Sequence, residues 1–514
     1  MTRARLPILG STIARRWLLG IGGTLFCLLV RGALQSDTDV PISTARPGGV
    51  AFASTDDQDD DDDTDDCKTR KLKKIRNLER FKNENGRHAT YSTSLEEELD
   101  LDNPFFRSLG TNGRACVTCH APKDAFSLSL PSIQKRFDES CGNDPLFAPI
   151  DGTDNPKADR STLEARRAAS SLLLKFGVIR IELPLPASEK RDFDLVAVDD
   201  PTGNLTSPCP PLCPDKIVVF RRPLMASNLR FPTDVIMHDS REPNLSSQAI
   251  NATLVHAESD GPPSAEDVAA IVDFETKLFT TQVVGPAGKT TKEEATGDPV
   301  TLSDGELFPF FNDMNRPPPA TCPPGTPTTP IGTTGPCRRF PLDVVNPDVF
   351  HQFDSWASSE DAARQSVARG QAIFNRRALK NPVQITNPVL MACSNCHNIP
   401  GSGGGSGDPT NVVGISNLEF RIPEMPLYTV RIRATGFLIQ TTDPGQAMTT
   451  GIMRTGSQNA FKTPQLRGLA AHAPYFHNGM ARTIEDVVEF YNVRFKAEFT
   501  EQERADLVAF LKSL

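Results

Sequence analysis

One five-residue pattern occurs twice in the chain, as Cys116-Val117-Thr118-Cys119-His120 and as Cys393-Ser394-Asn395-Cys396-His397. Two cysteines at this spacing bond to the two vinyl groups of a haem, and the adjacent histidine becomes the proximal ligand of the iron. Zinc half-sites and CxxC redox motifs are the alternatives, but zinc requires a further pair of Cys or His ligands beside each motif. We therefore predict two covalently bound haem c groups, with His120 and His397 as iron ligands.

Two distant motifs predict two haem domains. The chain has 514 residues, which is enough to bury two or more cores of ordinary domain size. We expect a mainly α fold of two cytochrome c-like haem domains with long irregular insertions. The N-terminal domain is predicted over residues 87–285, with an insertion rich in proline and polar residues at 141–220. A proline-rich linker over 286–345 leads to the C-terminal domain, 346–514.

Helix-capping patterns support the helical prediction. Ser264, Thr483 and Thr500 each stand three residues before an Asp or Glu, and apolar residues follow at helical spacing. This arrangement is typical of a capped helix N-terminus. A further helix is expected over residues 360–379, and strands are expected to be few.

The N-terminal residues predict export. Four arginines precede a fourteen-residue apolar run, Trp17–Val30, which is short for a membrane span. We predict a cleaved signal over residues 1–36, a periplasmic location, and no stable membrane insertion after cleavage. Residues 37–86 form an acidic and basic leader that is expected to be disordered, because nine aspartates lie in Asp56–Asp66. This run equals the whole net charge of −9, so nothing indicates nucleic-acid binding.

The remaining cysteines predict disulfides. Cys27 falls within the predicted signal. The six others outside the haem motifs are Cys67, Cys141, Cys209, Cys213, Cys322 and Cys337. An even number in an exported protein suggests up to three disulfides. We expect Cys209–Cys213 and Cys322–Cys337, because each would close a proline-rich loop; free buried thiols are the alternative.

Further segments resemble the bacterial dihaem cytochrome c peroxidase family, which includes MauG. Phe461–Arg467 (FKTPQLR) and Ala473–Gly479 (APYFHNG) match the most recognisable stretch of that family. Asp239–Ala249 resembles its Trp-Asp-Gly-Arg…Glu-Gln-Ala segment. The resemblance covers roughly residues 100–125, 220–282 and 360–514.

The resemblance implies a division of labour between the haems. The haem at His120 would bind hydrogen peroxide, and the haem at His397 would relay electrons from a small cytochrome c or cupredoxin. Gln248 falls on the distal glutamine of the family, and Glu258 falls on the distal glutamate that acts as acid and base. An ordinary surface carboxylate is the alternative for Glu258. His256 is a further candidate for the distal pocket, with a plain loop histidine as its alternative.

Two departures from the family concern the first haem. His238 stands where the family has a tryptophan between the haems, and histidine is a poorer relay for an electron hole. His238 could instead form a hydrogen bond to a haem propionate, approach the iron, or have a structural role. No histidine lies between His120 and His238 in the sequence. The first haem is therefore expected to be open, as in the MauG branch, unless His256 or His238 caps it.

Tyr491 is the candidate sixth ligand of the second haem. Classical members of the family have methionine at this position, and MauG has tyrosine. A phenolate ligand stabilises oxidised iron and lowers its reduction potential. An aromatic core residue is the alternative role for Tyr491. The alternative ligands are Met448, Met453 and Met480.

The family also binds calcium between its domains, through an asparagine side chain and backbone carbonyls. The carbonyls of His472 and Pro474 are the candidates here. However, the asparagine position falls on Arg222 or Pro223, which argues against the ion. His477 is expected at the interface between the haems.

These observations favour a periplasmic dihaem oxidoreductase that reduces hydrogen peroxide. One alternative is a MauG-like enzyme that oxidises a partner protein or an organic substrate through high-valent iron. The other is an electron carrier without enzymatic activity, in which both irons are six-coordinate.

Overall fold

The computed structural model shows how the haem motifs are embedded. It describes residues 67, 74–94, 97–205, 209, 213–230, 236–285, 349–380, 390–399, 402–404, 410–453 and 458–514. The predicted signal, most of the leader, the predicted linker and the Cys322–Cys337 pair lie outside the described residues.

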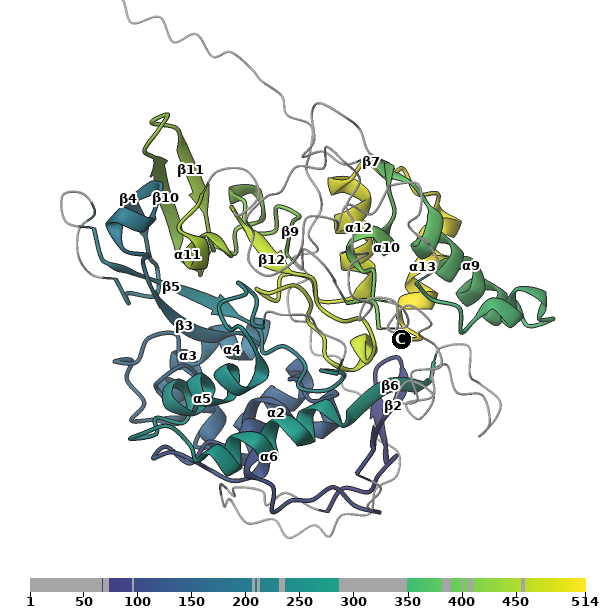
Figure 1. Ribbon diagram of the computed structural model, residues 1–514, viewed down its shortest axis with the longest axis horizontal. Coiled ribbons are helices and arrows are strands. Elements are labelled where there is room, and N and C mark those ends of the chain that lie inside the picture. Colours follow the sequence, from purple (N-terminus) through teal and green to yellow (C-terminus); the bar gives the residue numbers. More distant parts are fainter. Residues whose placement is uncertain are drawn as a thin grey trace, which may run out of the picture. The chain divides into compact units, whose positions relative to one another are not determined.

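The first half of the described chain contains both helices and strands (Figure 1). Its elements are β1 (Arg80–Asn83), β2 (Gly86–Ser92), α1 (Cys116–Cys119), α2 (Leu130–Ser140), α3 (Leu163–Ala169), α4 (Ser171–Phe176), β3 (Ile179–Pro184), β4 (Phe193–Asp199), β5 (Lys216–Arg221), α5 (Leu245–His256), α6 (Ala265–Thr276) and β6 (Leu278–Val284).

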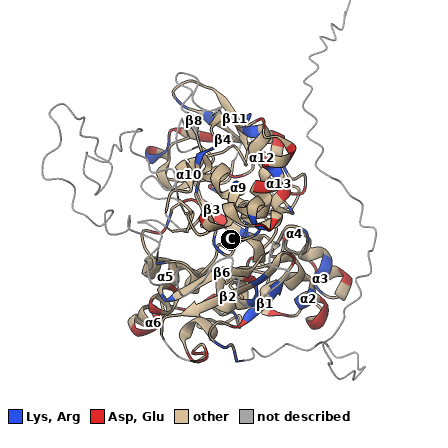
Figure 2. Cartoon of the chain, turned by 90° about the vertical axis from the view of Figure 1, so that its right-hand side faces the viewer, with Lys and Arg blue, Asp and Glu red and all other residues tan. Residues whose placement is uncertain are grey.

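The second half is also mixed. Its elements are α9 (Ala362–Arg376), β7 (Leu379–Lys380), β8 (Leu390–Met391), α10 (Cys393–Cys396), β9 (Thr410–Val412), β10 (Leu427–Ile432), β11 (Leu438–Thr441), α11 (Ala447–Thr450), β12 (Ala460–Lys462), α12 (Ile484–Arg494) and α13 (Glu501–Leu511). Acidic and basic residues are interspersed over α2, α3, α12 and α13 (Figure 2).

The strands form small antiparallel sheets, so the prediction of a mainly α fold with irregular insertions was wrong. Two sheets have three strands, in the orders β1-β2-β6 and β11-β10-β4, and the pairs β12-β9, β3-β5 and β7-β8 form the others. Residues 141–220 contain α3, α4, β3, β4 and all but the last residue of β5. The strands are short runs of β-branched and aromatic residues, such as Ile-Val-Val-Phe in β5. These residue types favour the strand conformation. These runs were not predicted as strands, because proline and polar residues surround them in the sequence.

One of these sheets joins segments far apart in the sequence. β4 pairs with β10 in a register that sets Phe193 opposite Ile432. The Tyr428 hydroxyl of β10 donates a hydrogen bond to the Val218 carbonyl of β5 at 2.5 Å. Phe193 and Tyr428 are fully buried in a core shared with Met448. The segment 141–220 is therefore packed against β10, which lies in the predicted C-terminal domain.

The helices confirm the capping analysis. Ser264, Thr483 and Thr500 each accept a hydrogen bond from the backbone N–H three residues later and begin α6, α12 and α13. The helix predicted over 360–379 is α9. It crosses α13 so closely that a side-chain carbon at Gly370 would collide with the carbonyl of Asp506. Glycine is therefore required at this crossing.

Two disulfides lie in the described residues. Cys209–Cys213 was predicted, and Cys67–Cys141, which joins the leader to the end of α2, was not. Among the described helices, none is both long and apolar enough to cross a membrane.

Candidate haem sites

The two Cys-x-x-Cys-His motifs are built alike. Each forms one helical turn, α1 or α10, which brings its two sulfur atoms to the same face because residues three apart are neighbours on a helix. The backbone N–H of His120 donates to the Cys116 carbonyl at 3.0 Å, and the N–H of His397 donates to the Cys393 carbonyl at 3.0 Å. Thr118 accepts a hydrogen bond that caps the first turn, at 3.0 Å, and Asn395 does the same for the second, at 2.5 Å.

Both motif histidines have their Nδ1 atom next to a backbone carbonyl. His120 Nδ1 is 3.2 Å from the Phe126 oxygen, and His397 Nδ1 is 2.6 Å from the Gly403 oxygen. A proton on Nδ1 leaves the lone pair on Nε2, which is the arrangement a metal-binding imidazole needs. Burial lowers the pKa of both rings to about 4, so both are neutral at neutral pH.

These observations fit haem c better than zinc. Burial raises the pKa of Cys116 and Cys393 to about 12 and of Cys119 and Cys396 to about 11, so the four thiols are protonated at neutral pH. Within the described ranges, no group of three or more His, Cys, Asp or Glu side chains could hold a metal ion. The motifs are therefore suited to thioether attachment.

A buried ion pair connects the first motif to His256. Arg114 and Asp151 form a salt bridge in which their side chains are 2% and 3% exposed. The other carboxylate oxygen of Asp151 is 2.6 Å from Nδ1 of His256. Burial opposes ionisation of Asp151, but Arg114 and His256 hold its pKa below the usual range. His256 is close enough to His120 to influence its pKa electrostatically.

Glu258 lies beside the same motif. Asn112, four residues before Cys116, donates from its side-chain amide to Glu258 Oε2 at 3.0 Å and to the His256 carbonyl at 2.8 Å. Thr111 donates to the backbone carbonyl of Glu258 at 2.8 Å. The Glu258 side chain is exposed, and its φ of 52° is in the left-handed region. The structure thus brings His256 and Glu258 to the segment that leads into α1.

Gln248 is placed differently. It lies in the first turn of α5, which Asn244 caps, and it is half-buried. His256 ends the same helix eight residues later, about 12 Å along the axis. Gln248 and His256 are therefore at opposite ends of α5.

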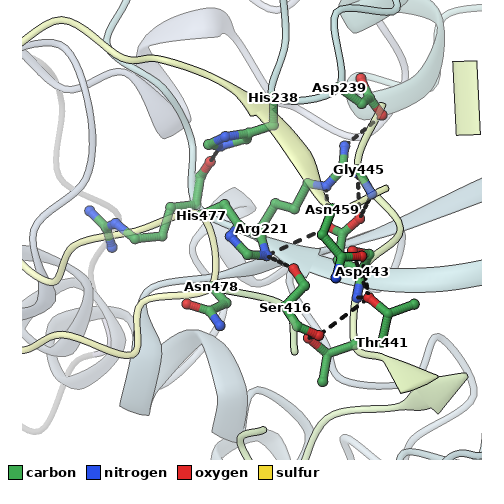
Figure 3. A network of polar contacts seen from close by, with 12 residues as sticks. Arg221, His238, Asp239, Ser416, Thr441, Asp443, Gly445, Asn459, His477 and Asn478 are labelled. Carbon is green, nitrogen blue, oxygen red and sulfur yellow. Dashed lines mark hydrogen bonds and ion pairs between the residues drawn. The ribbon is translucent and has the colours of Figure 1, made fainter. Parts of the chain in front are cut away.

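His238 and His477 lie together between several segments (Figure 3). Their ring centroids are 6.2 Å apart, and the ring of His477 stacks on Phe461 at 4.1 Å. His238 Nε2 is 2.9 Å from the Arg222 carbonyl oxygen. Burial lowers the pKa of His238 to about 4 and of His477 to about 3, so both rings are neutral at neutral pH.

A buried charge cluster borders this pair, and sequence reasoning missed most of it. Arg221 at the end of β5 donates to both carboxylate oxygens of Asp443, at 2.6 and 2.8 Å, and to Asp239 at 2.7 Å (Figure 3). Arg241 adds a contact of 2.9 Å to Asp239. Each of the first three side chains is at most 3% exposed. Arg221 and Asp443 are 222 residues apart, so no local pattern could indicate their pairing.

Tyr491 lies beside the second motif. Its ring centroid is 5.4 Å from that of Phe490 and 5.7 Å from that of Phe495, and it packs against the core that contains Cys393. Burial raises the pKa of its phenol, and Cys396 and Cys393 lie within electrostatic reach. The alternative ligands are elsewhere: Met448 and Met453 are in the core around β10, and Met480 packs near α4.

The calcium candidate does not fit. The guanidinium group of Arg222 donates a hydrogen bond of 2.7 Å to the His472 carbonyl. That carbonyl is one of the two that the family resemblance assigns to the ion. A positive side chain therefore faces the position that calcium would need.

Paired Cys-x-x-Cys-His turns with neutral, oriented histidines define the attachment geometry of c-type cytochromes. Comparison with known proteins narrows this class. The chain is 28% identical over 178 residues to a cytochrome c551 peroxidase of Nitrosomonas europaea, covering 34% of the chain and 42% of that protein. It is 27% identical over 174 residues to the methylamine utilization protein MauG of Methylophilus methylotrophus, covering 32% and 41%. It is 35% identical over 137 residues to the cytochrome-c peroxidase IdrP2 of Denitromonas iodatirespirans, covering 24% and 35%.

These comparisons confirm the resemblance drawn from the sequence: the chain is related to the cytochrome c peroxidase and MauG family. The match spans about two fifths of the length of the first two relatives. No protein-family model matches the chain.

Proposed function

We propose that the chain is an exported dihaem c-type oxidoreductase that reduces hydrogen peroxide at the His120 haem. The observation that carries the proposal is a difference between two otherwise similar sites. Aromatic side chains pack against both motifs, but the first motif also has the Arg114–Asp151–His256 cluster and Glu258 beside it. Titratable groups suit peroxide chemistry, and an apolar shell suits electron transfer.

Peroxide reduction to water consumes two electrons and two protons, and the residues supply the proton path. Haem attached at Cys116 and Cys119 would supply the iron that binds peroxide. His120 is set to hold that iron through Nε2. Asp151 accepts a hydrogen bond from Nδ1–H of His256, so Nε2 is the atom of His256 that would take up and return a proton. Electrons would come from a small cytochrome c or cupredoxin through the haem at His397.

The test is peroxide-dependent oxidation of a reduced small cytochrome c by the purified dihaem protein. His256→Gln should lower the rate constant for peroxide by about 100-fold or more, because a general acid and base is removed. The matched control is His351→Gln, since His351 also pairs with an aspartate, at 3.2 Å, but is half-exposed near α9. It should leave the rate unchanged.

Two outcomes would contradict this assignment. If Glu258→Gln lowers the rate and His256→Gln does not, the acid and base is Glu258. If the wild-type protein shows no spectral change with peroxide in any redox state, the peroxidase proposal fails. Two low-spin ferric signals in low-temperature electron paramagnetic resonance, with no high-spin signal appearing when one haem is reduced, would then identify an electron carrier.

Tyr491 favours a second candidate function, MauG-like oxidation of a partner protein or an organic substrate. The phenol lies near Cys393 and Cys396, where a tyrosine ligand to the second iron would lower its reduction potential. Tyr491→Phe should then shift the optical spectrum of the second haem and raise its potential. An unchanged spectrum would make Tyr491 a core aromatic and remove this candidate.

A further inference from the structure

Arg222 is a buried cation surrounded by backbone carbonyl groups. Its guanidinium group donates hydrogen bonds to the carbonyls of Leu128, Gly177 and His472; the last two distances are 3.2 and 2.7 Å. The side chain belongs to a residue that is 5% exposed. The three carbonyls come from the turn before α2, the end of α4 and the segment before α12, so one side chain joins three separate parts of the chain.

The chemistry of this cage is that of a hard-cation site. Backbone carbonyl oxygens are among the ligands that calcium prefers. Burial lowers the pKa of Arg222 to about 10, against the opposing influence of Tyr475 and Asp124. The group is therefore still positively charged at neutral pH, and it supplies one positive charge where a calcium ion would bring two.

Gly177 shows that the cage is shaped around the guanidinium group. Its φ is 65°, and a side-chain carbon there would collide with Nη1 of Arg222. Gly177 thus ends α4 in the left-handed conformation and also leaves the space that the guanidinium group fills.

We propose that Arg222 is a built-in cation that takes the place of the interdomain calcium implied by the family resemblance. It ties the segment after β5 to α2, α4 and the His472 segment without a metal ion. The protein is accordingly independent of calcium, whatever reaction its haems perform.

The first test uses the wild-type dihaem protein, passed through chelator-treated buffer. Elemental analysis should find less than about 0.1 calcium per chain, and the thermal midpoint should be the same within about 1 °C in EGTA and in millimolar calcium. One bound calcium per chain, or a midpoint that falls in EGTA, would overturn the proposal. This test requires no variant and no activity assay.

The second test perturbs the cage. Arg222→Gln should lower the thermal midpoint by roughly 5 °C or more, because three buried carbonyls lose a charged donor. The matched control is Arg433→Gln, since Arg433 also donates to two carbonyls, those of Ser188 and Arg191, but is 34% exposed. It should shift the midpoint by less than about 2 °C. Equal shifts would contradict the special role of Arg222.

A glycine pair separates crowding from backbone strain if Arg222→Gln fails to fold. Gly177→Ala places a carbon against the guanidinium group, whereas Gly203→Ala, at a φ of 70°, meets only an amide nitrogen at 3.6 Å. Both variants carry the strain of a left-handed alanine. The midpoint of Gly177→Ala should fall further by roughly 4 °C or more. Equal midpoints would show that Arg222 does not need this space, and would overturn the proposal.

Discussion

Glu275 is a buried acid beside the first haem motif. It lies near the end of α6, is 4% exposed, and its Oε2 atom has no hydrogen-bond partner among the described residues. It is within electrostatic reach of Cys116. Burial raises the pKa of Glu275 to about 8, from 4.5. The group is therefore largely protonated at neutral pH, which is the form that an apolar site tolerates.

This raised pKa predicts a stability that falls as the pH rises. Below about pH 4.5 the carboxyl is protonated in both the folded and the unfolded chain, so its ionisation does not change the free energy of unfolding. Between pH 4.5 and 8 the unfolded chain ionises and the folded one does not, so unfolding is favoured progressively. Replacing Glu275 by Gln should therefore stabilise the protein by roughly 3 kcal/mol more at pH 8 than at pH 5, as an upper bound.

The measurement is chemical unfolding of both proteins at the two pH values. Glu266→Gln, an exposed change in the first turn of the same helix, is the control and should show no such pH dependence. A variant that is equally stabilised or destabilised at both pH values would show that Glu275 does not titrate in this range.

At the scale of elements, local patterns predicted helices well and strands poorly. Thr483 and Thr500 begin helices because a hydroxyl and a carboxylate at fixed spacing satisfy free backbone groups, which depends only on adjacent residues. β4 depends on β10, whose residues lie more than two hundred positions later. A strand forms only when it pairs with a partner strand, and local sequence patterns do not show which distant segment that partner is.

The candidate site divides in the same way. Cys116, Cys119 and His120 could be proposed from the sequence as haem-binding residues, because haem attachment requires one fixed spacing. Asp151 was not, since it meets His256 across 105 residues and no motif surrounds it. The carbonyl cage of Arg222 was foreseen only as a place where calcium fitted badly.

At the scale of the whole molecule, Arg221 links segments on both sides of the predicted linker. It contacts Asp239 and Asp443, and Arg241 also pairs with Asp239, so the two carboxylates are balanced by two arginines. Burial opposes ionisation of Asp239, but Arg221 and Arg241 lower its pKa to about 2. The carboxylate therefore contributes stability above about pH 4 that is lost as the pH falls towards 2.

Replacing Arg221 by Met should be strongly destabilising, because it leaves the buried Asp443 carboxylate without its cation and leaves Asp239 paired only with the partly exposed Arg241. We expect a loss of about 3–5 kcal/mol at pH 7. The loss should shrink towards pH 5, since unpaired buried carboxyls take up protons at higher pH than paired ones. Arg433→Met removes an exposed pair with Asp194 and should cost less than about 1 kcal/mol at both values. The measurement is the free energy of unfolding of the two variants and the wild-type protein at pH 5 and pH 7. If the loss of stability in Arg221→Met does not change with pH, the carboxylates have found other partners.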